Sequence, residues 1–128
     1  MMSDTLVHLH GVPVLDCAPD GAQLRGTGDV LDVIGNAIGH GAELVLLPVQ
    51  RLTDDFFTLR TGLAGEIVQK FANYRIRLAV VGDISPHVAK SSALSAFVSE
   101  SSRGGQLWFV PTKDDLAERL RQQRRPAT

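Results

Sequence analysis

The sequence has a single cysteine, Cys17, no apolar run that approaches the length of a membrane span, and a formal net charge of only −1. One cysteine cannot form an internal disulfide, which favours a reducing compartment. A transmembrane helix needs about 18 or more consecutive apolar residues. The first ten residues also lack the basic stretch followed by an apolar one that is typical of a signal peptide. Together these absences predict a cytoplasmic protein that is not embedded in a membrane.

Internal repeats, low-complexity tracts and linkers are also missing. The chain has 128 residues, of which 44% are hydrophobic and 21% are charged, as in an ordinary globular protein. A chain of this length fits one domain with a core large enough to need neither disulfides nor a structural metal. We therefore predict a single domain over residues 1–128, with an ordered core over residues 5–120 and a basic tail over residues 121–128.

The small net charge hides an uneven distribution of charges along the chain. Residues 1–59 contain 2 basic and 8 acidic residues, whereas residues 60–128 contain 11 basic and 6 acidic residues. Such a dipolar molecule can steer a charged partner or pair head to tail with a second copy, so a homodimer is one expected form. The dense basic cluster lies at the C-terminal end, unlike the basic face of a nucleic-acid-binding domain, so no nucleic-acid partner is expected.

Apolar periodicity predicts strands that alternate with helices. Strands are expected over residues 5–10, 12–16, 43–49, 76–82 and 106–110, and helices over residues 29–40, 62–73, 88–101 and 113–123. Thr27 or Gly28 is expected to cap the first helix, Gly41 to end it and Thr112 to cap the last. Pro13 lacks a backbone donor, which favours an edge at its position.

Strands joined by helices of this length favour parallel pairing with right-handed crossovers. The predicted fold is therefore α/β, with a mixed, mostly parallel sheet of four or five strands and an antiparallel first hairpin. The predicted core contains residues from each of the central strands and helices: Leu46, Ile67, Phe71, Val80, Val81, Leu94 and Phe97.

The segment over residues 51–85 has the highest density of candidate functional residues. Its centre allows two interpretations of the secondary structure. In one, a single helix runs from Asp54 or Asp55 to Tyr74, although its two internal glycines would cost about 2 kcal/mol. In the other, residues 53–60 form a loop or a short turn and Thr61 caps a helix that starts at Gly62. A hydroxyl there would satisfy free N–H groups of the first turn, and a phosphate on it would meet the positive end of the helix.

Other polar residues have simpler explanations. Asp83 ends a predicted strand, where α/β sheets usually place ligands. Ser85, His87, Lys90, Ser91 and Ser92 follow it. A pair of Asp83 with His87 or Ser85 would suit acid–base or hydroxyl chemistry, but no G-x-S-x-G motif is present. Capping of the next helix by Asp83 or Ser85 is the simpler explanation.

Metal and cofactor sites are not predicted. His8 and His10 share a strand face, yet no third ligand is fixed by spacing. The stretch Gly26-Thr27-Gly28 lacks the third glycine and preceding strand of a dinucleotide loop and the lysine of a P-loop. Glu66 and Lys70, four residues apart, are expected to form a surface ion pair. Nothing near Cys17 in sequence would lower the pKa of its thiol.

The stretch from Asp54 to Asp83, DDFFTLRTGLAGEIVQKFANYRIRLAVVGD, resembles a bacterial family known as domain of unknown function 4180. The similarity extends over most of residues 5–120. The family implies no established biochemical activity.

The predicted order of elements is also similar to that of STAS domains, the fold of anti-sigma-factor antagonists. In those domains a serine or threonine opens the helix after the third strand, in a motif resembling S-G-L-G. Thr61, Gly62 and Leu63 match three of these positions by type, whereas Ala64 stands before Gly65 where the motif has glycine. The loop before Thr61 is also longer here. This resemblance implies a phosphoacceptor role for Thr61.

The function expected from these patterns is a non-catalytic regulatory or protein-binding module. Its partner would be a protein, with Thr61 as the candidate phosphoacceptor. The expected binding surface consists of residues on either side of Thr61 and after the next strand: Asp54, Asp55, Gly62, Glu66, Asp83 and Ser85. The alternative is a small enzyme whose acidic cleft is built from Asp54, Asp55, Glu66 and Asp83, which requires these groups to converge in one pocket.

Overall fold

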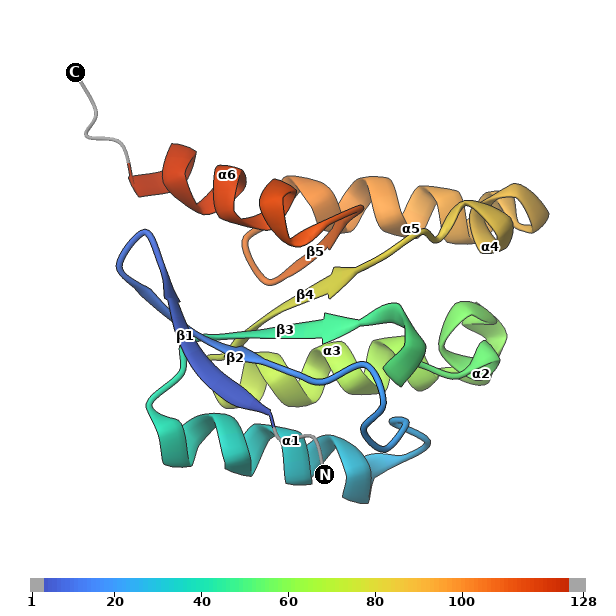
Figure 1. The fold of residues 1–128 in the computed structure, drawn as a ribbon. Coiled ribbons are helices and arrows are strands. Elements are labelled where there is room, and N and C mark those ends of the chain that lie inside the picture. Colours follow the sequence, from blue (N-terminus) through green and yellow to red (C-terminus); the bar gives the residue numbers. More distant parts are fainter. Residues whose placement is uncertain (1–3, 125–128) are drawn as a thin grey trace.

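The protein is built on one five-stranded sheet, seen in a computed structural model that describes residues 4–124 (Figure 1). The strands are β1 (Thr5–Leu9), β2 (Val12–Asp16), β3 (Leu44–Pro48), β4 (Arg77–Val81) and β5 (Leu107–Val110). They lie in the sheet in the same order as in the sequence. β1 is antiparallel to β2, and all other neighbours are parallel. The predicted mixed, mostly parallel sheet is confirmed.

Within the described residues, six α-helices and two short 3₁₀ turns connect or follow the strands. They are α1 (Thr27–His40), η1 (Val49–Arg51), α2 (Asp54–Phe57), η2 (Leu59–Thr61), α3 (Leu63–Asn73), α4 (Ser85–Lys90), α5 (Ser92–Arg103) and α6 (Lys113–Arg124). No helix within residues 4–124 combines the length and the apolar character needed to cross a membrane.

The helices cover the two faces of the sheet unequally. Figure 1 shows α1 and α3 on one side of the sheet and α6 on the other. The larger buried cluster joins Ile34 of α1, Phe71 of α3 and Leu94 of α5, so these three helices share a face. Right-handed crossovers that all advance in one direction along a sheet place their helices on one face. On the other face, Leu116 of α6 packs with Trp108 of β5.

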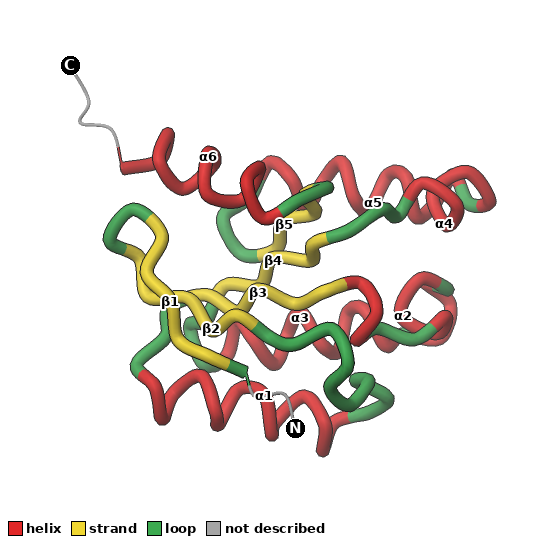
Figure 2. The backbone as a smooth tube through the Cα atoms, in the orientation of Figure 1, coloured by secondary structure: helices red, strands yellow, loops and turns green. Residues whose placement is uncertain are grey.

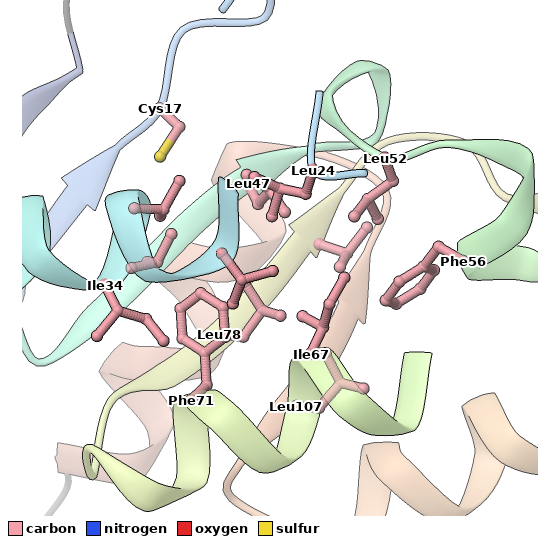
Figure 3. Close-up of a cluster of buried hydrophobic side chains, with 14 of the residues drawn as sticks. Cys17, Leu24, Ile34, Leu47, Leu52, Phe56, Ile67, Phe71, Leu78 and Leu107 are labelled. Carbon is pink, nitrogen blue, oxygen red and sulfur yellow. The ribbon is translucent and has the colours of Figure 1, made fainter. Parts of the chain in front are cut away.

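The larger cluster contains most of the predicted core (Figure 3). Ile67 and Phe71, which Figure 3 labels on α3, are fully buried. Leu46, Val80 and Leu94 are also buried. Val81 and Phe97 are only partly buried, which corrects the prediction for these two residues. Val81 ends β4, and Phe97 packs against Phe109 of the edge strand β5, with ring centroids 6.4 Å apart.

The chain between β3 and β4 does not form one long helix. α2, η2 and α3 follow one another, and Gly62 separates η2 from α3 with φ +80°, a backbone conformation that favours glycine. Short helical turns therefore precede α3, as the second interpretation allowed, and α3 begins at Leu63, one residue later than predicted.

The predicted helix over residues 88–101 is wrong, because this stretch belongs to two helices. Pro86 lies in the first turn of α4, which starts at Ser85, a favourable position for proline. Ser91 then adopts an extended conformation and its side chain accepts a hydrogen bond from the Leu94 N–H at 3.1 Å. This cap ends α4 and starts α5.

The predicted caps of the first and last helices are partly confirmed. Gly41 ends α1 in the left-handed conformation, as expected, but α1 begins at Thr27 after Gly26, so neither Thr27 nor Gly28 is its cap. The Thr112 hydroxyl oxygen accepts from the Asp115 N–H at 3.2 Å and caps α6 as predicted.

Pro13 does not mark a sheet edge, since β2 lies between β1 and β3. Its carbonyl accepts from the Glu43 N–H at 2.8 Å, next to the first residue of β3. The N–H and carbonyl of one residue point to the same side of a strand. The missing donor of Pro13 therefore falls at the start of the parallel ladder, where it costs little.

The C-terminal helix is held by an arginine–tryptophan contact. The Arg119 guanidinium lies 4.2 Å from the Trp108 ring centroid, and Arg77 approaches the same ring at 5.5 Å. Because α6 runs to Arg124, residues 121–124 continue the helix instead of forming a tail. Residues 125–128 of the expected tail lie outside the described residues.

A buried arginine fixes the loop between β2 and α1. The Arg51 side chain is 5% exposed and donates hydrogen bonds to the Ala18 carbonyl at 2.9 Å, the Ala22 carbonyl at 2.5 Å and the Asp4 carboxylate at 3.3 Å. The Ala18 N–H donates to the same carboxylate at 2.9 Å. A buried charge is stable only when paired and hydrogen-bonded in this way.

Replacement of Phe71 by alanine tests the core. Phe71→Ala is expected to lower the free energy of unfolding by about 3–5 kcal/mol, because it empties a fully buried site. Urea unfolding followed by circular dichroism measures the change. Tyr74→Ala, at a position 49% exposed on the residue after α3, is the control and should change stability by less than about 0.5 kcal/mol. Equal effects of the two substitutions would contradict the placement of α3.

Replacement of Arg51 tests its network. Arg51→Ala is expected to destabilise the protein by about 3–5 kcal/mol, because it leaves two loop carbonyls without their donor and the partly buried Asp4 carboxylate without its cationic partner. The same unfolding measurement applies. Arg103→Ala removes an arginine whose side chain is 79% exposed and should change stability by less than about 0.5 kcal/mol. A stability loss for Arg51→Ala no larger than that of this control would show that the network contributes nothing.

Candidate functional site

The ends of β3 and β4 bring the most polar loops of the protein together. The chain continues from β3 through η1 into α2, and from β4 into α4, so both short helices lie beyond the carboxyl ends of the strands (Figure 2). Ligands of open α/β sheets usually bind at this edge. We call this region, residues 54–62 and 83–91, the carboxyl-end surface.

A cavity of about 500 Å³, here called the first cavity, lies between the two parts of this surface. Its lining comes from α2, η2 and the residue between them, and from α4 and the start of α5: Asp54, Phe57, Thr58, Leu59, Arg60, His87, Lys90, Ser91 and Ala93. Three of these side chains are basic and one is acidic. The first cavity therefore combines a basic character with the size of a small-molecule site.

An aromatic stack fixes one wall of the first cavity. The rings of Phe57 and His87 lie 4.0 Å apart between centroids, with an angle of 10° between their planes. Phe57 is itself buried, and it meets Phe56 edge-on at 5.1 Å. The His87 imidazole is thus held by a ring that belongs to the core.

A second cavity, of about 490 Å³, lies on the other side of Asp54. Its lining comes from the loop before α1 and from the start of α2: Gln23, Arg25, Leu52, Thr53, Asp54 and Asp55. The Leu24 N–H donates to the Arg51 carbonyl at 2.8 Å, which joins the two lining segments. The Arg51 network therefore also sets the position of this cavity.

Thr61 lies at the junction of η2 and α3 and is exposed. Its hydroxyl donates to the Asp55 carbonyl at 2.7 Å and its oxygen accepts from the Leu63 N–H at 3.2 Å. Gly62, also exposed, is the residue directly before α3. The Thr61 hydroxyl thus connects the end of α2 to the first turn of α3.

Asp83 and Ser85 begin the second part of the carboxyl-end surface. The Asp83 carboxylate accepts from the N–H of Ser85, the first residue of α4, at 2.9 Å. The N-cap position itself is Ile84, so neither Asp83 nor Ser85 is the cap residue that the sequence predicted. The hydroxyl and backbone N–H of Ser85 lower the pKa of Asp83. Both residues are exposed, and neither lines one of the two cavities.

The four carboxylates of the enzyme alternative do not converge. Asp54 lines both cavities and Asp55 lines the second, but Glu66 and Asp83 line neither. The Glu66 carboxylate instead accepts a hydrogen bond from the Thr27 hydroxyl at the start of α1. Glu66 also forms no ion pair with Lys70 within the described chain, so that prediction is wrong. Within residues 4–124, these four carboxylates therefore line no common cavity.

Metal ligands do not gather either. Within residues 4–124, no group of three or more His, Cys, Asp or Glu side chains is arranged to hold a metal ion. His8 lies in β1, but His10 lies in the turn after it with φ +51°, so the two residues do not continue one strand face.

Sequence reasoning missed the first cavity as a unit. His87, Lys90 and Ser91 stand out as a polar cluster after Asp83, but Arg60 and Phe57 come from a segment about 30 residues earlier. One signal was available, namely that both segments follow strands expected to be parallel neighbours. Their meeting across the cavity depends on how α2 and α4 turn away from the sheet.

Comparison with protein families gives one match. The model of a family described as domain of unknown function (DUF4180) matches residues 9–120. No curated protein and no solved structure matches the chain.

Cys17 lies outside both cavities, and its thiol should be unreactive. The side chain is 1% exposed, and burial, reinforced by the Asp4 carboxylate, raises the pKa of Cys17 to about 12. The thiolate is the reactive form, and at pH 8 it would be roughly one part in ten thousand of the thiol. Ellman's reagent is therefore expected to label the folded protein far more slowly than the protein in guanidinium chloride. Rapid stoichiometric labelling of the folded protein would contradict this environment.

Proposed function

The chain belongs to the family of domain of unknown function 4180, and we propose that it is a non-catalytic regulatory module that binds a protein partner through its carboxyl-end surface. The observation that carries the proposal is the position of Thr61. Thr61 is an exposed residue, and its hydroxyl holds the junction between α2 and α3. A modification there would change the shape of the surface as well as its charge.

Phosphorylation of Thr61 by an external kinase would replace the hydroxyl hydrogen with a phosphoryl group. The hydrogen bond to the Asp55 carbonyl, 2.7 Å long, would then be lost because the ester oxygen has no proton to donate. The phosphate would add a charge of about −1.5 to −2 beside Asp54 and Asp55. The free N–H groups at the start of α3 favour a negative charge at this position. We infer that the phosphate would move toward the N-terminus of α3, and that α2 would lose its contact with Thr61.

The character of the surface fits a transient interaction. The large exposed apolar side chains of the described residues, Leu31, Ile38 and Tyr74, lie on α1 and after α3, away from the carboxyl-end surface. A partner at the carboxyl-end surface would therefore make mainly polar contacts, which are typical of short-lived signalling complexes. The resemblance of Thr61-Gly62-Leu63 to the STAS motif supports the same role.

The local role of the hydroxyl can be measured without a partner. Thr61→Val removes both hydrogen bonds and is expected to lower the free energy of unfolding by about 1–2 kcal/mol. Thr61→Ser keeps the hydroxyl and serves as the matched control, with a loss of less than about 0.5 kcal/mol. Equal losses for valine and serine would show that the hydroxyl does not hold the junction.

The partner is tested by affinity purification from the native host with quantitative mass spectrometry. The baits are the wild-type protein, Thr61→Ser and Thr61→Glu. We expect a protein that co-purifies equally with the first two baits and differently with Thr61→Glu, together with a phosphorylated peptide that contains Thr61. Recovery of a second copy of this chain would identify a homodimer. Identical partners for all three baits, with Thr61 unmodified, would overturn the proposal that phosphorylation of Thr61 regulates partner binding.

A further inference from the structure

We propose that the first cavity binds the phosphate or carboxylate group of a small molecule. The proposal rests on the side chains that line the first cavity and does not require phosphorylation of Thr61 or a protein partner. It assigns to Arg60, His87 and Lys90 a role that the protein-binding proposal leaves open.

The balance of charge in the first cavity favours an anion. Two cationic side chains, Arg60 and Lys90, line it against the single carboxylate of Asp54, and the His87 imidazole adds a ring N–H donor. Four ion pairs occur within residues 4–124, and neither Arg60 nor Lys90 takes part in any of them. Both side chains therefore keep their hydrogen-bond donors available. An arginine offers a planar pair of donors that matches an oxyanion, and a lysine adds a point charge.

Two parts of the lining are held in place before any ligand arrives. The His87 ring is stacked on the buried Phe57 ring at 4.0 Å. The Ser91 oxygen accepts from the Leu94 N–H at 3.1 Å, which leaves its hydroxyl hydrogen free to donate. Side chains that are already ordered lose little conformational freedom on binding, so their contacts contribute more to affinity.

The size of the first cavity limits the rest of the ligand. A volume of about 500 Å³ is at the lower end of the range for small-molecule sites. Phe57, Leu59 and Ala93 supply the apolar part of the lining. The ligand is therefore a small organic anion, with its charged group at Arg60, His87 and Lys90 and a compact apolar portion beside Phe57.

The test uses the purified, unphosphorylated protein labelled with ¹⁵N. Sodium phosphate and sodium acetate are titrated separately at constant ionic strength, and amide chemical shifts are followed. We expect saturable shifts at residues 57–60 and 87–93. Saturation with phosphate alone would identify a phosphorylated ligand, and saturation with acetate alone a carboxylate. Absence of saturable shifts with either anion would overturn the proposal.

Variants that remove one charge show whether each side chain strengthens or weakens anion binding. Arg60→Gln and Lys90→Gln are each expected to weaken binding roughly tenfold, the loss that follows from removing one charge-assisted contact. Asp54→Asn removes the opposing carboxylate and should tighten binding several-fold. Arg103→Gln and Lys70→Gln are matched controls outside the cavity and should leave the dissociation constant unchanged. Thermal unfolding of each variant verifies that it is folded.

These outcomes separate the two proposals. Equal anion affinities for Arg60→Gln, Lys90→Gln and their controls would place the anion elsewhere and overturn the assignment of this cavity. The Thr61→Glu bait experiment would be unaffected by that result. Conversely, saturable binding that depends on Arg60 and Lys90 would stand even if no partner distinguished Thr61→Glu from the wild-type protein.

Discussion

The buried guanidinium of Arg51 is the constraint on which the arrangement of the carboxyl-end surface depends. Arg51 is the last residue of η1, the turn that follows β3. Its guanidinium donates hydrogen bonds to the Asp4 carboxylate before β1 and to carbonyls of the loop between β2 and α1. These segments are far apart in sequence, and one side chain joins them. Since α2 starts three residues after Arg51, this network determines the direction in which the chain leaves the sheet. Both cavities are consequences of that direction.

The regular part of the fold was predictable because it follows from simple patterns. The strands over residues 44–48 and 77–81 are continuous apolar runs, as a strand covered on both faces requires. The failures occurred where a single residue changes the local geometry. Ser91 divides an apparently continuous helical pattern into α4 and α5. Gly62, in contrast, separates η2 from α3 close to where one of the two interpretations of the sequence placed the break, because a glycine inside a helix is unfavourable.

The candidate site was less predictable, for a different reason. Asp54, Asp55 and Thr61 do lie together, because they are close in sequence. Glu66 was expected beside them, but its carboxylate reaches Thr27 of α1 instead. The core-facing side of α3 was predicted correctly through Ile67 and Phe71, but the sequence did not show that α1 lies beside α3. The first cavity combines Arg60 with His87, a pairing that only the packed structure shows.

The order of the strands has a consequence for how the protein is made. Every strand pairs with the strand that precedes it in the chain, from β1 to β5. A ribosome releases the chain in that same direction, so each new strand leaves the exit tunnel when its neighbour is already present. No strand has to wait for a partner that is synthesised much later, in contrast to folds whose first strand pairs with their last. Nearest-neighbour pairing of this kind keeps the loop-closure cost of each strand below the cost of pairing the first strand with the last. The sheet can therefore grow during translation, one strand at a time, with α6 closing its second face at the end.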